Sequence, residues 1–279
     1  MAVVAAVQMV SSDKLEENLA NARQLVSAAA AVGAKLIVLP ENFALFSAPL
    51  MLQLGQGETS AEGRVRKFLS TLAKDFSVWI VGGSIPVASD VPATNNPNNK
   101  VYACCFVFDE QGIERACYRK IHLFDVDVND VQGQYRESDS ITPGDEVVVI
   151  DTPFGRLGVA ICYDLRFPEL FRVMFQRGVD LIAIPAAFTQ VTGAAHWLAL
   201  LRARAIENFC TLIGANQGGV HNPKRETFGH SVIINCWGEV VAEIDKGQGF
   251  IYFDVDEKQQ QQIRQQIPIK SHQRLFVED

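Results

Sequence analysis

Cys162 is the residue in this sequence that is best placed to act as a nucleophile. It follows the apolar run 157–161 and precedes Pro168, so it lies between a predicted buried strand and the start of a predicted helix. The thiolate form of cysteine is a strong nucleophile, and backbone N–H groups or basic residues near such a turn stabilise it. The plainer alternative is a buried structural cysteine, which explains the cysteines in the other apolar runs well.

Two charged residues also stand at the predicted ends of strands. Glu41 follows the apolar segment 36–39 and one proline, at the edge of the sheet where the active sites of α/β proteins collect. Lys120 ends a predicted strand, where its ammonium points either into a cleft or into water. His122 offers a competing base, because imidazole is the usual partner of a thiol nucleophile. The residue types alone do not rank Lys120 above His122.

Glu137 lies in the segment Tyr135-Arg-Glu-Ser138 and has two interpretations. It is either the buried partner of a lysine or an exposed acid of a loop. The sequence pattern around it does not choose between them.

Two similar α/β halves are expected to position these residues. The first half alternates predicted strands at 2–9, 36–39 and 78–81 with helices at 15–29 and 65–72, and the second alternates strands at 157–161, 181–184 and 211–216 with helices from 168 and from about 195 to 208. Each half also contains a predicted hairpin, at 101–118 and at 231–244. Segment 33–40 aligns with segment 178–185, which indicates an internal repeat.

The pattern predicts the α/β class, in the form of a four-layer α-β-β-α sandwich that occupies residues 1–279 as a single domain. Parallel strands that are apolar on both faces need cover on both sides, and two sheets with helices on one side each can cover each other. The alternative is a doubly wound Rossmann-type sheet. We disfavour it because no G-x-G-x-x-G motif follows the first strand.

Composition excludes several classes of protein. With 48% hydrophobic and 20% charged residues among 279, the chain can bury a large core, so it is neither disordered nor a disulfide-stapled miniprotein. A net charge of −7 without a basic run disfavours nucleic-acid and membrane partners. The five histidines are isolated and the six cysteines contain no Cys-x-x-Cys pair, so we expect no metal and no cofactor. With no evident secretion signal, we expect a reducing cytoplasm.

Three segments of the chain resemble the signature segments of the nitrilase, or carbon–nitrogen hydrolase, superfamily. They are Leu39-Pro-Glu41, Tyr118-Arg-Lys120, and Gly158-Val-Ala-Ile-Cys-Tyr-Asp-Leu-Arg-Phe-Pro-Glu169. Three motifs in the same order are specific, although any one of them would be weak. The likeness extends over nearly the whole chain.

The resemblance implies a role for each matching residue. Cys162 matches the family's nucleophile, Glu41 its general base and Lys120 its third catalytic residue, while Glu137 matches a second acid that positions the lysine and the base. The family fold is the α-β-β-α sandwich, and its members pair as homodimers. His122 has no catalytic part in this pattern. The backbone N–H of Tyr163 is expected to join Lys120 in binding the oxyanion of the reaction.

Within the superfamily, the segments Gly193–Trp197, Leu201–Asn208 and Gly229–Ser231 look most like the deaminated glutathione amidase branch. This implies a small α-keto acid amide as substrate, with α-ketoglutaramate, the ω-amidase substrate, or an N-carbamoyl amino acid as alternatives. A carboxylate-bearing substrate needs a cation, for which Arg166 and Arg172 are the candidates. An ion pair with Glu169 is the alternative role of Arg166.

The predicted wall of the substrate pocket consists of the residues that follow the two pseudo-equivalent strand ends, namely Phe43, Phe188 and Thr189. Two hypotheses of other classes remain open at this point. The chain could be a non-catalytic nitrilase-like binding protein that retains its three catalytic residues without turnover, or a Cys–His peptidase that uses His122.

Overall fold

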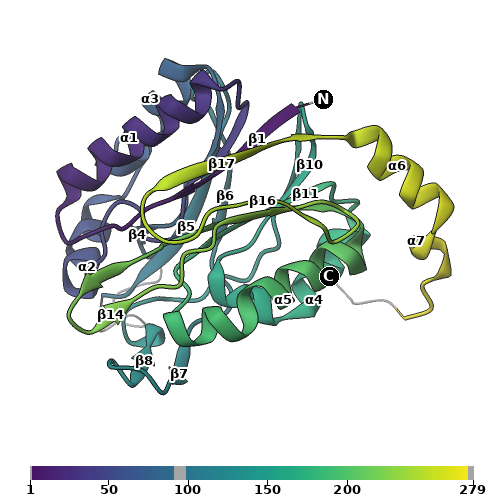
Figure 1. Ribbon diagram of the computed structural model, residues 1–279. Coiled ribbons are helices and arrows are strands. Elements are labelled where there is room, and N and C mark those ends of the chain that lie inside the picture. The colour runs from purple at the N-terminus through teal and green to yellow at the C-terminus, as the bar shows by residue number, and fades with distance from the viewer. Residues whose placement is uncertain (1, 91–98, 276–279) are drawn as a thin grey trace.

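The computed structural model describes residues 2–90 and 99–275, and it arranges them in two stacked sheets with helices on the outer faces (Figure 1). The first sheet has the spatial order β17 (Gly249–Val255), β1 (Ala2–Gln8), β2 (Leu36–Val38), β3 (Trp79–Val81), β5 (Val101–Phe108) and β4 (Ile85–Ala88), with β6 (Glu114–Arg119) also paired to β5. The second has the order β16 (Val240–Glu243), β15 (Val232–Ile234), β12 (Thr211–Asn216), β11 (Leu181–Ala186), β10 (Gly155–Val159) and β9 (Val149–Thr152).

Helices cover the side of each sheet that faces away from the other sheet. α1 (Leu15–Ala31) and α3 (Arg64–Phe76) pack together on the first sheet, and α4 (Pro168–Gln176) and α5 (Gln190–Asn208) pack together on the second. The predicted α-β-β-α sandwich is therefore confirmed. Its two halves are alike, because β1, β2 and β3 pair in parallel, as do β10, β11 and β12.

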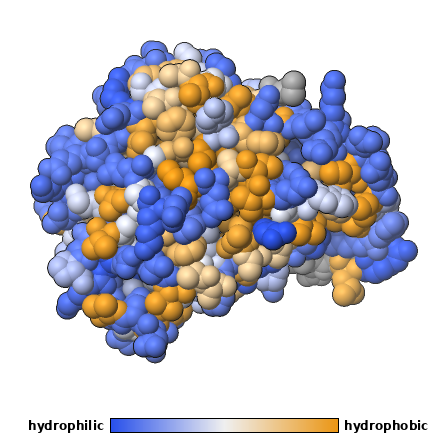
Figure 2. All heavy atoms as spheres, viewed as in Figure 1, coloured by the Kyte–Doolittle hydropathy of each residue, from blue (hydrophilic) through white to orange (hydrophobic). Residues whose placement is uncertain are grey.

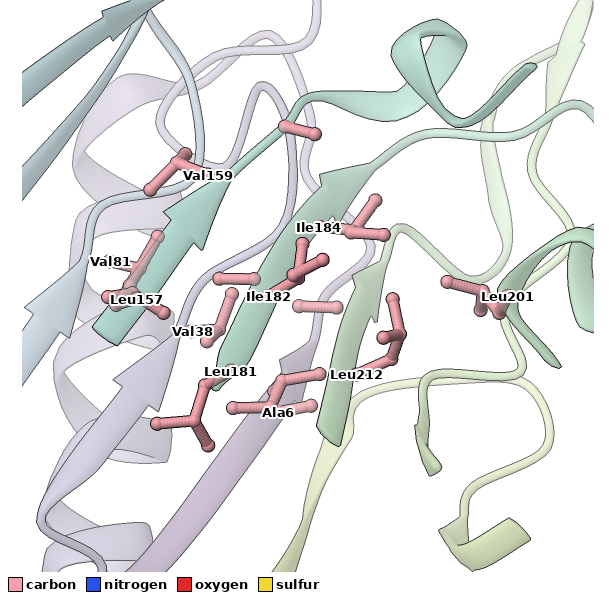
Figure 3. Close-up of a cluster of buried hydrophobic side chains, with 14 of the residues drawn as sticks. Ala6, Val38, Val81, Leu157, Val159, Leu181, Ile182, Ile184, Leu201 and Leu212 are labelled. Atoms are coloured by element: carbon pink, nitrogen blue, oxygen red, sulfur yellow. The ribbon is translucent and has the colours of Figure 1, made fainter. Parts of the chain in front are cut away.

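The central strands β2 and β3 of the first sheet are apolar throughout because they are buried on both faces. Along β1, Val4 and Ala6 belong to the core between the sheets, whereas Ala5 and Val7 belong to the core under α1 and α3. This alternation is the period of two that a strand imposes on its side chains. Figure 3 shows the core between the sheets, where Ala6, Val38 and Val81 of the first sheet meet Leu157, Ile182 and Leu212 of the second.

The helix expected to begin near residue 195 begins at Gln190 instead. Thr189 caps it, with its side-chain oxygen accepting a hydrogen bond from the backbone N–H of Thr192 at 3.2 Å. A threonine at this position satisfies a backbone donor that the first turn leaves free. The segment that follows β11 is thus a short loop and the helix α5. Across 2–90 and 99–275, none of the helices combines the length and the apolar character that a membrane crossing needs.

Several short elements that the sequence pattern did not predict lie at one end of the sandwich. They are α2 (Ala48–Gly57), the ribbon of β7 (Asp125–Asp127) and β8 (Gln134–Arg136), and the ribbon of β13 (Val220–Asn222) and β14 (Arg225–Glu226). Figure 1 shows β14 and the β7–β8 ribbon at this end, and α6 (Glu257–Gln266) and α7 (Ile269–His272) at the other. On the face seen in Figure 2, hydrophilic and hydrophobic residues are interspersed.

Candidate active site

Glu41, Lys120 and Glu137 form a buried cluster of charges at the end of the sandwich that carries the short ribbons. The Lys120 Nζ lies 2.8 Å from Glu41 Oε1 and 2.9 Å from both carboxylate oxygens of Glu137. The side chains of Lys120 and Glu41 are only 2% and 6% exposed, and that of Glu137 is 20% exposed. A lysine this deeply buried needs opposite charges around it, and two carboxylates supply them.

Both acids are also held by hydrogen bonds that do not involve Lys120. The backbone carbonyl of Glu41 accepts a hydrogen bond from the side-chain Nε2 of Gln217 at 3.0 Å, and Glu137 Oε2 accepts one from the backbone N–H of Phe124 at 2.7 Å. Gly83 has a φ of +62° and packs directly against the carbonyl of Pro40, so that a larger residue there would displace the turn that carries Glu41. The positions of both acids are therefore set by the fold.

Cys162 lies at the same place, in the turn after β10. It opens the short 3-10 helix η2 (Cys162–Arg166), is 8% exposed, and has a φ of +49°, a left-handed conformation that is costly for a residue with a side chain. The Glu41 carboxylate and the backbone N–H of Ala187 both lie near its sulfur. The strained turn thus presents the sulfur to the base that the sequence predicts for it.

Asp164 ties the segment that carries Cys162 to the segment that carries Lys120. Its buried carboxylate accepts hydrogen bonds from the backbone N–H of Ile161 at 2.8 Å and from the hydroxyl of Tyr118 at 2.7 Å. It also accepts from the backbone N–H of His122 at 3.0 Å, with the His122 Nδ1 at 2.8 Å. One side chain therefore fixes the residue before the nucleophile and the residues on both sides of the lysine.

We expect Asp164→Ala to destabilise the protein by about 3 kcal/mol, because it leaves several buried donors without an acceptor. Amide hydrolysis should also fall, since both Cys162 and Lys120 lose their positioning. Urea unfolding followed by circular dichroism measures the first effect. Asp151→Ala is the control, because the Asp151 carboxylate is 82% exposed and its ion pair with Arg156 contributes little. Equal stability of the two variants would contradict the role given to Asp164.

The electrostatics of the cluster keep the cysteine protonated at rest. Burial raises the pKa of the Cys162 thiol well above its ordinary value, and the nearby Glu41 carboxylate raises it further, against the opposing effects of Lys120 and the Ala187 N–H. Burial disfavours the Lys120 ammonium, but Glu137 and Glu41 outweigh it and hold the pKa of Lys120 well above its usual range. Burial also raises the pKa of Glu137, with Lys120 opposing it. The turn therefore does not hold a ready-made thiolate, and the thiol needs a base.

A cavity of about 520 Å³ opens above this cluster. Glu41, Lys120, Glu137 and Cys162 line it, as do four of the predicted substrate-binding residues, namely Tyr163, Arg166, Phe188 and Thr189. The Arg166 guanidinium lies over the rings of Tyr163 and Phe188, and its Nη2 is 3.2 Å from His196 Nδ1, so the ion pair with Glu169 considered above does not form.

Two of the predicted substrate-binding residues do not line this cavity. Phe43 is fully buried in the core under α1 and α3, because the turn after Glu41 points it inward, and Phe46 lines the cavity instead. Arg172 lies on α4, where its guanidinium packs over the ring of Phe175 at 5.0 Å. These two assignments are corrected accordingly.

His122 does not line the cavity either. Its Nδ1 is bound to Asp164, and its ring stacks on Phe167 with the centroids 3.6 Å apart. The structure thereby separates Lys120 from His122, which residue types left unranked, because Lys120 lines the cavity with Glu41 and Cys162 and His122 does not. In the part of the chain that the structure describes, no group of three or more His, Cys, Asp and Glu side chains is arranged to hold a metal ion.

Sequence reasoning missed the cavity residues that the short elements contribute. Phe46 precedes α2, Tyr135 lies on β8, and His221 and Arg225 lie on the β13–β14 ribbon. The segment 221–226 reads as an exposed polar turn, and its only signal is a cationic pair next to a proline. These residues become candidate site residues only because the fold brings this ribbon over the cavity.

The two-sheet sandwich is that of the class of hydrolases that the three sequence segments resemble. A family profile described as "Carbon-nitrogen hydrolase" matches residues 3–265. The chain therefore belongs to the carbon–nitrogen hydrolase family, and the enzyme class expected from the sequence is confirmed.

Known proteins of this family are similar to this chain over nearly its whole length. It is 38% identical over 272 residues to "Deaminated glutathione amidase" of Yersinia enterocolitica, covering 98% of this chain and 93% of that one. It is 37% identical over 267 residues to "Omega-amidase NIT2" of Homo sapiens, covering 95% and 92%. The crystal structure of Nit3 from Saccharomyces cerevisiae, described as a member of branch 10 of the nitrilase superfamily, matches with a TM-score of 0.86 and 31% identity, covering 98% and 97%. The similarity to the deaminated glutathione amidase branch is thus confirmed.

Proposed function

We propose that this protein is an amidase that hydrolyses the amide bond of a small α-keto acid amide through a thioester on Cys162. The observation that carries the proposal is the convergence of Glu41, Lys120 and Glu137 on Cys162 at one wall of the cavity. A nucleophile, a proton acceptor and a fixed cation within contact of one another are what acyl transfer requires.

In the first half of the reaction, Glu41 accepts the thiol proton as the sulfur attacks the amide carbon. The raised pKa of the thiol favours proton transfer to Glu41 during the attack over a free thiolate formed beforehand, because the thiol holds its proton until the nearby carboxylate accepts it. The carbonyl oxygen becomes negative and is bound by Lys120 and the backbone N–H of Tyr163. An ammonium has three N–H groups, so two can serve Glu41 and Glu137 while the third turns to the oxyanion.

In the second half, the C–N bond breaks as Glu41 returns the proton to the departing nitrogen, which leaves a thioester on Cys162. Glu41 then takes a proton from water, the resulting hydroxide attacks the thioester carbon, and the sulfur leaves as the acid forms. The proton held by Glu41 returns to the sulfur and restores the resting thiol. Glu137 acts through Lys120 by holding its ammonium in place.

We propose deaminated glutathione as the substrate, hydrolysed to α-ketoglutarate and cysteinylglycine. The names of several relatives support it, and the name of the ω-amidase relative supports α-ketoglutaramate as the second candidate. Both candidates carry a carboxylate, which suits a cavity bordered by Arg166.

A product assay separates these candidates. Purified enzyme is incubated with deaminated glutathione, α-ketoglutaramate and N-carbamoyl-β-alanine in parallel, and the α-ketoglutarate and ammonia that are released are measured. We expect α-ketoglutarate without ammonia from the first substrate, both products from the second at a lower kcat/KM, and little from the third. Ammonia from the carbamoyl compound without α-ketoglutarate from the other two would overturn the proposal.

Glu41→Gln separates the two effects of Glu41 on the cysteine. Losing the carboxylate removes a charge that raises the thiol pKa, so the rate of alkylation by iodoacetamide should reach its midpoint at a lower pH than in the wild type. Amide hydrolysis should nevertheless fall by about 10²- to 10⁴-fold, because the base is gone. The exposed Glu146→Gln is the control, with both properties unchanged. An alkylation midpoint that stays in place or rises would contradict the charge effect.

We further propose that residues 1–279 act as one domain, that two copies associate as a homodimer, and that the protein works in a reducing cytoplasm. The core shared by the two sheets supports a single domain, and family membership supports the homodimer. The need for a reduced Cys162 supports a reducing cytoplasm. In sedimentation equilibrium, we expect a molecular mass twice that of the chain.

A further inference from the structure

Arg225 is a cation at the cavity that has no carboxylate partner among the described residues. It lies on β14 and lines the cavity, where its Nη2 donates a hydrogen bond to the carbonyl of Ala187 at 3.0 Å. Its Nη1 is buried and has no hydrogen-bond partner within residues 2–90 and 99–275. By contrast, Arg136 at the same cavity is paired with Asp127 at 2.9 Å. Leaving a buried charged donor unpaired is costly, so a partner from outside the chain is expected at Nη1.

The guanidinium of Arg225 is held in a defined orientation. Its central carbon lies 4.7 Å from the ring centroid of Tyr135 and 5.8 Å from that of Phe46. Tyr135 is itself fixed by its hydroxyl, which donates to Asp130 at 2.8 Å, and Phe46 stacks on His221 with the centroids 3.9 Å apart. Aromatic contacts keep a guanidinium planar and in place without neutralising its charge. The site is therefore preorganised for an anion.

Arg225 is also adjacent to the reacting centre. Ala187, whose carbonyl accepts from Arg225, presents its backbone N–H to the Cys162 sulfur. An anion bound at Arg225 would therefore lie close to the nucleophile. Because a guanidinium presents parallel N–H groups that match the two oxygens of a carboxylate, the chemical group that fits is a substrate carboxylate.

We propose that Arg225 determines specificity by binding a carboxylate on the leaving-group side of the substrate, while Arg166 binds the carboxylate of the acyl part. Arg166 belongs to the same short helix as Cys162, to which the acyl group stays attached. Arg225 lies on a ribbon whose neighbouring residues Asn222 and Lys224 are exposed, at the side from which an amine can leave. The inference rests on the proposed amidase function and narrows its substrates to amides with a carboxylate on each side of the scissile bond.

Deaminated glutathione has such a second carboxylate, on its glycine, whereas α-ketoglutaramate does not. The test therefore compares deaminated glutathione with the same compound carrying a glycine carboxamide, in the wild type and in Arg225→Met. We expect the wild type to prefer the carboxylate by about 30- to 100-fold in kcat/KM, and the preference to shrink to within about threefold in Arg225→Met. Arg225→Lys keeps the positive charge but lacks the parallel N–H groups of the guanidinium, so it should restore part of the preference for the carboxylate.

Lys224→Met is the matched control, because it removes a cation from the same ribbon at an exposed position that does not line the cavity. It should keep the wild-type preference. Thermal unfolding of each variant separates loss of fold from loss of recognition. An equal loss on both compounds in Arg225→Met, or a wild type that does not distinguish them, would overturn the inference. If the wild type releases no α-ketoglutarate from either compound, the proposed function is rejected, and this inference with it.

Discussion

Cys162→Ala is expected to reduce amide hydrolysis to the background rate, a loss of at least about 10⁵-fold. The substitution removes the only atom in the cluster that can form the covalent intermediate, and neither Glu41 nor Lys120 can replace it. The fold should survive, because alanine fills the turn after β10 and leaves the hydrogen bonds of Asp164 in place. Mass spectrometry of protein quenched during turnover should show an acyl adduct in the wild type and none in the variant.

Cys117→Ala serves as the control, since this half-buried cysteine lies on β6 away from the cavity. We expect its kcat/KM to stay within about threefold of the wild type. Appreciable turnover by Cys162→Ala would exclude the thioester route. An inactive wild type with an unmodified, slowly alkylated Cys162 would favour the alternative of a non-catalytic binding protein.

Lys120→Met is expected to reduce kcat by about 10²- to 10³-fold or more, which corresponds to about 3 to 4 kcal/mol of lost transition-state stabilisation. The loss should fall mainly on kcat, because the ammonium meets the carbonyl oxygen most strongly once that oxygen is negative. Stopped-flow and steady-state kinetics with deaminated glutathione measure the effect. Near-normal kcat would remove the lysine from the mechanism.

The same substitution also tests the buried charges. Without Lys120, Glu41 and Glu137 face each other with no cation between them, and the protein should lose about 3 to 5 kcal/mol of stability. The double variant Lys120→Met/Glu137→Gln removes one of the two acids and should recover much of that stability while staying inactive. Recovered stability without recovered activity separates the catalytic part of the lysine from its structural part.

The residue pattern predicts most of the strands and helices because burial imposes a local period on them. Segment 36–39 is apolar at every position because alternate residues enter two different cores, whereas residues 181–184 of the duplicated segment all belong to one core cluster. The short ribbons β7–β8 and β13–β14 escaped prediction because they are small and largely exposed, so no hydrophobic period marks them.

The sequence by itself predicts Cys162 as a candidate nucleophile and places Glu41 at the end of a strand. It also shows the family resemblance, because each of these inferences depends on residues that are close together along the chain. Only the tertiary structure decided that Lys120, and not His122, contacts Glu41. It also decided that Glu137 packs against Lys120 and that Arg225 lines the cavity. Lys120 and Glu41 are 79 positions apart, and Asp164 reaches back 46 positions to Tyr118. Contacts of that range arise from how two sheets pack and how loops close over them, which no local period encodes.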